Sequence, residues 1–309
     1  MDGLLVVDKP VGPTSHDVVA RVRQAVGERR IGHAGTLDPG ASGVLVLVMG
    51  RATRLVQFLT GDTKTYEAVV RLGVSTDTYD WQGQATGPSH AGELPPRASV
   101  EETLSAFVGT ILQCPPPFSA KKIGGHRSYD LARLHRQRGN DLVVPPAVSV
   151  SVERVDVTSY GDGLVGVAID CSAGFYVRSL AHDLGERLGT GAHLASLRRT
   201  RSGEFTIADA HALTAIEGTD RQAPTALVPM SRMLTSLPAV TLTIQGMARI
   251  THGRDLGSDD WGPSHQGEPL FTDGGRPAQA VRVLSAAGDL LAVATMVRPD
   301  LLHPSVVLK

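Results

Sequence analysis

One short segment of the chain holds an acidic side chain in a setting that suits chemistry. The segment reads Gly-His-Ala-Gly-Thr-Leu-Asp-Pro-Gly-Ala-Ser-Gly over residues 32–43, with Asp38 directly before Pro39. Its glycines predict a shaped loop, because glycine adopts positive φ angles without strain, and Pro39 disfavours a helical conformation at Asp38. A carboxylate on such a loop can act as a nucleophile or as a general base. The alternative is that Asp38 only caps a turn, as Asp before Pro often does.

The elements expected on either side can hold this loop in place. Thr14 or Ser15 can cap a helix whose valines at 18, 19, 22 and 26 share one face, and which ends at Gly27. After the loop, the apolar run Val44–Met49 predicts a buried strand, and a shorter strand at the start of the chain ends at Pro10.

Other patterns predict the rest of a mixed domain. Alternating apolar residues predict strands over Tyr66–Leu72 and Val165–Cys171. Leucines spaced four apart predict a helix over about Arg178–Leu188. Ser99 with Glu102 resembles a capping box, which would open another helix.

Basic residues gather in one part of the chain. The formal net charge is only −1, which by itself does not indicate a nucleic-acid-binding protein. Within residues 121–138 the basic side chains, set against the single acid Asp130, are Lys121, Lys122, Arg127, Arg133, Arg136 and Arg138. The acids gather elsewhere, at Asp255, Asp259, Asp260, Glu268 and Asp273. Such separation would give a basic face that follows phosphates, although a solvated run of charges has the same pattern.

The composition limits the class of protein. The longest apolar run, Val44–Met49, is far shorter than the roughly 18 residues that a membrane helix needs, and the N-terminus lacks the features of a signal peptide. Cys114 and Cys171 are far apart and outside any paired metal-ligand spacing. The glycine-rich loop also lacks the Gly-Lys-Ser/Thr ending of a P-loop. We therefore expect a cytoplasmic protein with reduced thiols, no metal and no cofactor.

The pattern of strand and helix signals in the sequence changes near Leu237-Pro238. Beyond this point, Ala239–Ile244 and Val281–Val297 read as strands separated by a Gly- and Asp-rich middle with little helical pattern. We expect a larger domain over residues 1–236, with a basic insertion at about 115–146, and a small β-rich domain over residues 237–309.

Five segments together resemble the TruB family of pseudouridine synthases. The loop matches the family pattern G-H-x-G-x-L-D-P-x-A-x-G at every specified position. The other similar segments, in the family's order, are GLLVVDKPVGPTSHDVV from Gly3, Gly61–Gly83, PPPFSAKKIGGHRSYDLAR from Pro115, and Cys171–Phe205. The resemblance covers the chain from residue 3 to about 205.

This resemblance implies roles for individual residues. Asp38 would be the nucleophile that attacks the target nucleoside, so that the uracil detaches, turns and rejoins through carbon. Arg178 would pair with Asp38 and favour its ionised form. Tyr66 would stack on the flipped base and take part in proton transfer. The expected substrate-binding residues are His33, Lys64, Tyr176, Leu197, Lys121, Lys122, Arg198 and Arg199. Without the motifs, Tyr66 and Leu197 would be taken as core residues.

The resemblance also implies a fold and a substrate. The catalytic domain would be α+β, with a mixed, largely antiparallel sheet and flanking helices, followed by a PUA-like β domain. The reaction would convert the T-loop uridine of tRNA, conventionally numbered 55, to pseudouridine. The insertion would close over the T arm, with a hinge at Gly124-Gly125. We expect a monomer that needs no obligate protein partner and does not bind a membrane. The alternatives are an RNA-guided relative that modifies ribosomal RNA and an RNA chaperone that refolds tRNA without chemistry.

Overall fold

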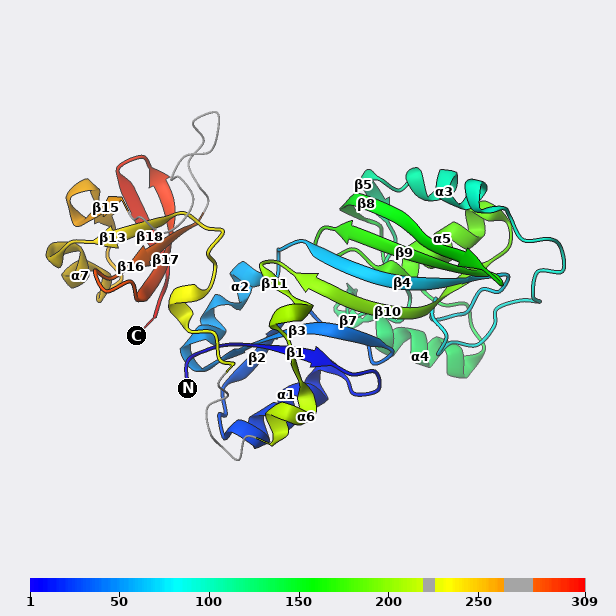
Figure 1. The fold of residues 1–309 in the computed structure, drawn as a ribbon, viewed down its shortest axis with the longest axis horizontal. Helices are drawn as coiled ribbons and strands as arrows, with labels where there is room; N and C mark the ends of the chain where they lie inside the picture. Colours follow the sequence, from blue (N-terminus) through cyan, green and yellow to red (C-terminus); the bar gives the residue numbers. More distant parts are fainter. Residues whose placement is uncertain (219–225, 264–279, 309) are drawn as a thin grey trace.

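The computed structural model describes residues 1–218, 226–263 and 280–308 and contains two large sheets (Figure 1). The strands of the ten-stranded sheet are β1 (Gly3–Lys9), β2 (Ile31–Ala34), β3 (Ala41–Met49), β4 (Lys64–Leu72), β5 (Gly109–Gln113), β8 (Val148–Gly161), β9 (Leu164–Cys171), β10 (Ala192–Ser202), β11 (Phe205–Thr206) and β12 (His211–Ala212). The strands of the six-stranded sheet are β13 (Ala239–Leu242), β14 (Leu256–Gly257), β15 (Trp261–Pro263), β16 (Val281–Leu284), β17 (Leu290–Arg298) and β18 (Leu301–Val307). A separate hairpin consists of β6 (Lys122–Ile123) and β7 (His126–Arg127).

Helices flank both sheets. The α-helices are α1 (Ser15–Val26), α2 (Val56–Leu59), α3 (Arg97–Ser105), α4 (Ser128–Arg138), α5 (Val177–Leu188), α6 (Leu213–Glu217) and α7 (Ile244–Ile250). The 3₁₀ turns are η1 (Gly50–Leu55), η2 (Ile207–Asp209), η3 (Met230–Arg232) and η4 (Ser258–Asp260). Along the part of the chain that is described, no helix is both long and apolar enough to cross a bilayer.

The larger sheet is mixed and largely antiparallel, which confirms the predicted fold class. Its strand order is β12-β1-β3-β10-β4-β9-β8-β5, with β2 added to β3 and β11 added to β10. Only the β1–β12 and β3–β10 pairs of this sheet run parallel. Strand β10 therefore lies between β3 and β4, and its register sets Arg199 opposite both Gly43 and Tyr66. Segments separated by more than a hundred residues are thus brought side by side.

The first helix forms as predicted. Thr14 is the N-cap of α1, where its side chain accepts from the Asp17 N–H and the Asp17 carboxylate accepts from the Thr14 N–H. This capping box satisfies donors that a helix start otherwise leaves unpaired. The helix ends at Gly27, whose left-handed φ of 70° suits glycine. The valines of α1 are buried against the sheet, so the helix is fixed beneath β1, β2 and β3 (Figure 1).

Two predicted boundaries were wrong. Helix α3 begins at Arg97 after Pro96, so Ser99 lies inside the helix and caps nothing. The fixed φ of proline at Pro96 starts the helix earlier than the capping-box pattern suggested. The glycine-rich segment is also not a loop throughout, because β2 pairs with β3 through residue 34 and β3 begins at Ala41. Only residues 35–40 are left as the loop that carries the aspartate.

The six-stranded sheet has more structure than its sequence indicated. The run Val281–Val297 is not one strand, since β16 and β17 form an antiparallel pair around a turn at Gly288. Helix α7, capped by Thr243, was not predicted. The expected acidic residues Glu268 and Asp273 lie outside the described residues.

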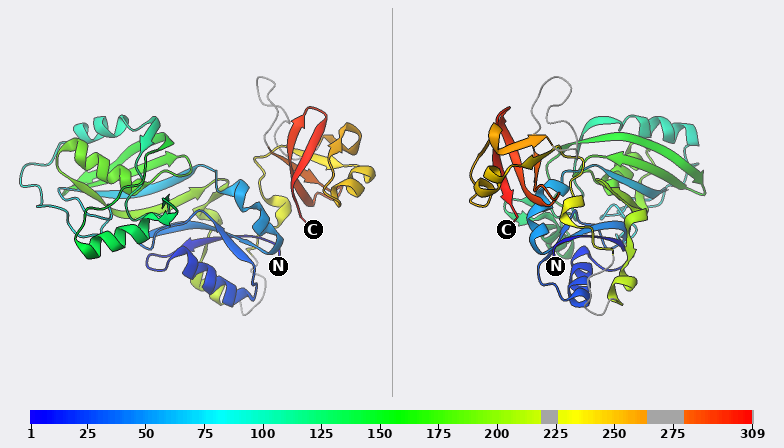
Figure 2. Two further views of the ribbon diagram at one scale, coloured as in Figure 1. Left: turned by 180° about the vertical axis from the view of Figure 1, so that it is seen from behind. Right: turned by 60° about the vertical axis from the view of Figure 1, so that its left-hand side comes forward.

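An apolar cluster joins the two sheets. It contains Leu4 and Val48 from one face of the larger sheet and Val293 and Val306 from the smaller one. Met233 and its neighbours from the connecting segment fill the space between them. Figure 2 shows the smaller sheet lying beside the end of the larger one at which the N-terminus is found. The other face of the larger sheet packs on α1, α3 and α5 and forms the main core.

Candidate active site

The Asp38 loop is tied down on both sides of the carboxylate. The Ser15 hydroxyl donates to the Leu37 carbonyl and accepts from the Leu37 N–H, both at 2.9 Å. On the other side, the Gly12 N–H donates to the Pro39 carbonyl at 2.8 Å. The Asp38 side chain itself is 42% exposed. The loop is therefore rigid in its backbone, while its carboxylate remains accessible.

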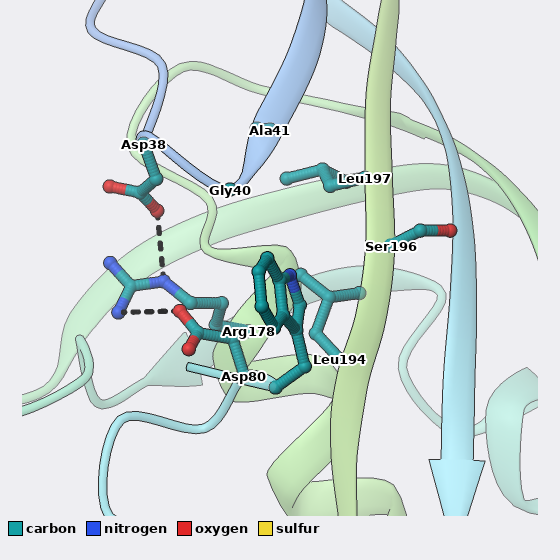
Figure 3. Close-up of a pocket in the computed structure, with 9 residues that line it drawn as sticks. Asp38, Gly40, Ala41, Asp80, Arg178, Leu194, Ser196 and Leu197 are labelled. Carbon is teal, nitrogen blue, oxygen red and sulfur yellow. Dashed lines mark ion pairs between the residues drawn. The ribbon is translucent and has the colours of Figure 1, made fainter. Parts of the chain in front are cut away.

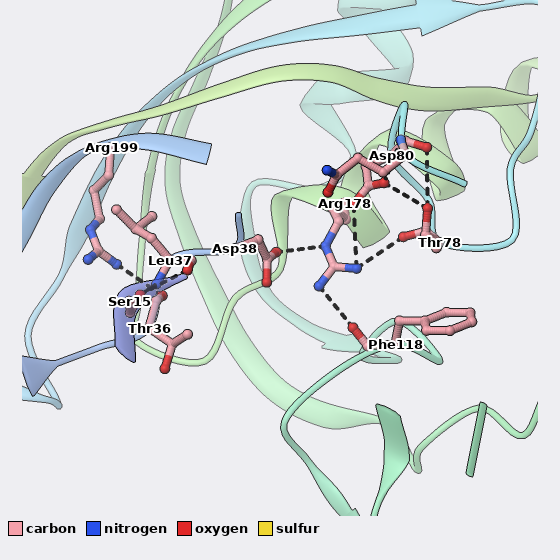
Figure 4. A network of polar contacts seen from close by, with 10 residues as sticks. Ser15, Thr36, Leu37, Asp38, Thr78, Asp80, Phe118, Arg178 and Arg199 are labelled. Carbon is pink, nitrogen blue, oxygen red and sulfur yellow. Dashed lines mark hydrogen bonds and ion pairs between the residues drawn. The ribbon is translucent and has the colours of Figure 1, made fainter. Parts of the chain in front are cut away.

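Arg199 anchors the same loop from below. Its side chain is 1% exposed, and its guanidinium donates to the carbonyls of Val44 (2.8 Å) and Gly35 (3.1 Å). A longer contact of 3.5 Å to the Thr36 carbonyl is drawn in Figure 4. Gly43, with φ of 102°, allows the backbone of β10 to lie close to β3, because a Cβ there would lie 2.1 Å from the Arg199 carbonyl oxygen. A guanidinium committed to buried carbonyls cannot reach a phosphate, so the geometry gives Arg199 a positioning role in place of the expected RNA contact.

Lys9 is a second buried cation beneath the loop, and sequence reasoning assigned no role to it. Its ammonium donates to the carbonyls of Pro10 (2.9 Å) and Ala41 (2.7 Å). Burial lowers the pKa of Lys9 to about 8, with the nearby charge of Asp38 acting in the opposite direction. The signal that could have found this residue is a lysine near the end of a strand whose preceding residues, Leu4–Val7, are all apolar.

Arg178, at the start of α5, faces Asp38 directly. Its Nε lies 2.9 Å from Asp38 Oδ2, an ion pair that lacks the alignment of a full hydrogen bond (Figure 3). Its two terminal nitrogens donate to the carbonyls of Thr78 (3.1 Å) and Phe118 (3.0 Å). With only 6% of its side chain exposed, Arg178 is held in one orientation from three sides. A buried cation of this kind fixes the position of the carboxylate and stabilises its charge.

Asp80 completes the polar network, and sequence reasoning missed it. Its Oδ2 lies 3.7 Å from Arg178 Nη1, and its Oδ1 accepts from the Thr78 hydroxyl (2.7 Å) and the Gln82 N–H (3.0 Å). Figure 4 shows Arg178 between the two carboxylates of Asp38 and Asp80. The segment Gly61–Gly83 was matched to the family, but no spacing in it indicated that this acid faces the arginine.

A small pocket opens beside the carboxylate. Its lining residues are Asp38, Gly40, Ala41, Asp80, Trp81, Arg178, Leu194, Ser196 and Leu197 (Figure 3). The predicted residues Asp38, Arg178 and Leu197 thus meet in one place, contributed by the loop, by α5 and by β10. A charged end and an apolar wall suit a flat, partly polar molecule such as a nucleobase.

Tyr66 and Lys64 lie deeper, on β4. Tyr66 is 9% exposed, and burial raises the pKa of its phenol, while the nearby Arg199 acts to lower it. Lys64 is 5% exposed, and its ammonium donates to the carbonyls of Thr60 and Asp62. Its contacts are therefore with the protein, whereas the sequence suggested a substrate contact.

His33 lies on β2 and Tyr176 directly precedes α5. The His33 ring is edge-on to His16 with centroids 5.3 Å apart, and its buried Nδ1 has no hydrogen-bond partner. Burial lowers the pKa of His33, so the ring is neutral near pH 7. Tyr176 precedes Arg178 and is half-buried, and burial raises the pKa of its phenol.

The basic insertion reaches the site through its inner end. Phe118 supplies a carbonyl to Arg178, and Arg136 of α4 pairs with Asp77, which is 12% exposed. Lys122, on the β6–β7 hairpin, is exposed, and Lys121 is half-buried. On the far side of the loop, Arg198 pairs with Asp8 through two contacts of 3.1 and 2.8 Å and is partly exposed.

Comparison with known proteins identifies the family. The profile described as "TruB family pseudouridylate synthase (N terminal domain)" matches residues 23–177, and that of the "tRNA pseudouridylate synthase B C-terminal domain" matches residues 178–235. A relative from Solibacter usitatus, named tRNA pseudouridine synthase B, is 42% identical over all of both chains. The chain belongs to the TruB family of pseudouridylate synthases. A relative of the same name from Geobacter sulfurreducens is 44% identical over 82% of each chain.

Two solved structures have a similar fold. A chain in "Crystal Structure of a Cbf5-Nop10-Gar1 Complex" is 27% identical with a TM-score of 0.73, over 99% of this chain and 85% of that one. A chain in "Structure of H/ACA RNP bound to a substrate RNA containing 2'-deoxyuridine" is 26% identical with a TM-score of 0.71, over the same shares. The similarity extends through the smaller β-rich sheet as well as the catalytic one.

Proposed function

We propose that this TruB-family protein is a tRNA pseudouridine synthase that isomerises the T-loop uridine at position 55, with Asp38 as its nucleophile. The observation that carries the proposal is the half-exposed Asp38 carboxylate, held by the buried Arg178 at the mouth of a partly apolar pocket. The full-length relatives named tRNA pseudouridine synthase B support the choice of substrate.

The geometry suits a covalent mechanism without a redox step. The carboxylate attacks the nucleoside, the bond between uracil and ribose breaks, and the base turns and rejoins through C5. The bond between Asp38 and the nucleoside is released again, the proton on C5 is lost to solvent and the freed ring nitrogen N1 takes up a proton, so the product is an isomer of the substrate. Arg178 keeps the carboxylate in place throughout, because its other contacts are with two backbone carbonyls and with Asp80, none of which moves with the substrate.

The remaining predicted residues act around this centre. Tyr66 lies on β4 opposite Arg199 and would contact the flipped base, as would Leu197, which lines the pocket from β10. The neutral His33 and the half-buried Tyr176 would border the entering nucleotide. Lys64 and Arg199 support the site from beneath.

The target base must leave the loop of the RNA to reach Asp38, which costs roughly a few kcal/mol. Contacts with phosphates offset that cost. The exposed Lys122, the adjacent Lys121 and the partly exposed Arg198 would make such contacts. The insertion over residues 115–146 would close on the T arm, and the six-stranded sheet over residues 237–309 would act as a PUA-like domain.

We propose further that the protein acts as a monomer in the cytoplasm, where tRNA is its substrate. The related solved complexes contain further proteins by their titles. In this chain, the insertion supplies Phe118 and Arg136 to the site network from within the same polypeptide. That self-sufficiency favours a stand-alone enzyme over the RNA-guided alternative.

The test is tritium release from C5-labelled uridine in an unmodified tRNA transcript, comparing wild type with Asp38→Asn. We expect release by wild type only, and its loss when the T-loop uridine is replaced by cytidine. Asp38→Asn protein should still bind the tRNA. Binding by wild type without release would support the RNA-chaperone alternative and contradict the proposal.

A further inference from the structure

Trp81 is an aromatic side chain that the catalytic network does not use. Its side chain is 51% exposed, although it lines the same pocket as Asp38 and Leu197. Aromatic residues make up only 4% of the chain. Among the described residues, the only other strongly exposed aromatic side chain is Tyr129, at 38%. A large apolar surface left open beside a reaction centre indicates a contact with something that binds there.

The backbone of Trp81 is fixed even though its side chain is not covered. The Trp81 N–H donates to the Leu194 carbonyl at 2.9 Å, and the Leu194 N–H donates to the Tyr79 carbonyl at 3.0 Å. These bonds attach the segment to β10. On one side the Thr76 hydroxyl donates to the Asp80 carbonyl at 2.7 Å, which closes the turn. The indole is therefore presented from a rigid support, so little ordering entropy is lost when a ligand contacts it.

The edge of the Trp81 indole also packs against the loop that carries Asp38. A Cβ added to Gly40 would lie 3.2 Å from both Trp81 Nε1 and Gln82 Oε1. Gly40 is two residues from Asp38, so the edge of the indole lies against the loop that carries the carboxylate. A side chain at position 40 would push the indole away, and Gly40 thereby leaves room for Trp81 at the mouth of the pocket.

We propose that Trp81 is a stacking platform for the unpaired base next to the target uridine, and so a specificity-determining residue. The inference rests on the proposed function, since it needs a nucleotide flipped toward Asp38. The target uracil goes into the pocket, between the carboxylate and the wall that includes Leu197. The neighbouring base in the RNA must then lie at the mouth of the pocket, where the Trp81 indole is exposed to solvent. Every base has a π-face, and stacking on an aromatic side chain stabilises single-stranded RNA on proteins.

On this proposal, two apolar surfaces contact two different bases of the RNA. Leu197 borders the reacting base, whereas Trp81 replaces the stacking that the neighbouring base loses when the target leaves the loop. Removing the indole should weaken RNA binding and leave the chemical step nearly unchanged. The loss should be greater for a purine neighbour, because a purine has the larger face.

Fluorescence gives a direct readout, because the chain has only two tryptophans. The second, Trp261, lies in β15 of the smaller sheet, and its replacement by Phe leaves Trp81 as the sole indole. We expect a T-arm stem-loop to quench the emission of Trp261→Phe protein. An RNA that is abasic at the position stacked on the indole should bind with much less quenching.

Binding and turnover then test the energetic role. Trp81→Ala should raise KM for the stem-loop about five- to 150-fold, the range for loss of one base–aromatic stack. Its kcat should stay within about twofold of wild type, and Trp81→Phe, which keeps an aromatic face, should restore most of the affinity. Tyr129→Ala is the matched control, since it removes an exposed ring from α4 rather than from the mouth of the pocket.

The deciding comparison is a double-mutant cycle between Trp81→Ala and an abasic substitution on each side of the target uridine. The loss of affinity caused by Trp81→Ala should disappear with one of the two abasic RNAs. Any loss of affinity caused by Tyr129→Ala should persist with both abasic RNAs. An equal Trp81→Ala penalty on all three RNAs, or no quenching of Trp81, would overturn the inference while wild-type tritium release continued. Absence of release from the wild type would instead overturn the proposed function.

Discussion

Two aspartates on one turn allow the catalytic network to be tested with a matched pair of substitutions. Asp80 faces Arg178 at 3.7 Å, and Asp77, three residues earlier, pairs with Arg136 of the insertion. Each carboxylate also accepts a backbone N–H through its Oδ1 atom, from Gln82 and Gln84 respectively. Asparagine keeps an oxygen for that bond, so both Asp→Asn changes remove a charge while preserving the turn.

The expected effect of Asp80→Asn follows from the geometry. Two unit charges 4 Å apart interact by about 4 kcal/mol at an effective dielectric of 20, which is an upper limit for a pair that water partly reaches. The loss of one ionised partner from a hydrogen-bonded network amounts to about 1.5–3 kcal/mol. If Asp80 holds Arg178 in place for catalysis, the single-turnover rate should fall about ten- to a hundredfold.

The two variants should differ in which property they lose, catalytic rate or tRNA affinity. Asp80→Asn should lower the rate of tritium release, measured with enzyme in excess, and leave the Kd for tRNA within about threefold of wild type. Asp77→Asn frees the inner side of α4, so it should weaken tRNA binding and leave the single-turnover rate close to wild type. Filter binding measures the affinity of each. Equal loss of rate in both variants, or an unchanged rate in Asp80→Asn protein, would refute the positioning role of Asp80.

Three further predictions follow from buried groups. Gly43→Ala should destabilise the fold by about 3 kcal/mol or more in urea unfolding, because its Cβ would overlap the Arg199 carbonyl; a variant as stable as wild type would contradict this. Native protein should react with one equivalent of a thiol reagent at pH 8, since Cys114 is exposed and burial raises the pKa of Cys171 to about 12. Reaction of two equivalents before the protein unfolds would contradict the burial of Cys171. Burial lowers the folded pKa of Lys9 to about 8 from an ordinary value of 10.5, so the unfolded chain binds more protons between those values. The unfolding free energy of wild type relative to Lys9→Met should therefore rise with pH across that window, and a flat or falling difference would count against it.

The sequence by itself determined the local structure where short-range rules decide. The Thr14 cap, the valine face of α1 and the end at Gly27 depend on residues within one helix, and all formed as predicted. Alternation likewise predicted β4 and β9, because the side-chain period of a strand is local. The motif around Asp38 indicated the family, and the mixed, largely antiparallel sheet followed from that resemblance.

What the tertiary structure decided were the partners of buried charges. Nothing within the sequence near Arg199 indicates that its guanidinium lies under the Asp38 loop, since that position depends on the parallel pairing of β10 with β3. Asp80 and Lys9 were missed for the same reason, as each acts on a segment distant in sequence. Burying a charge is unfavourable unless partners surround it, and only the assembled fold supplies those partners. The arginines at 198 and 199 are adjacent in the chain, yet one faces Asp8 at the surface and the other supports the catalytic loop, because successive side chains of a strand point to opposite faces.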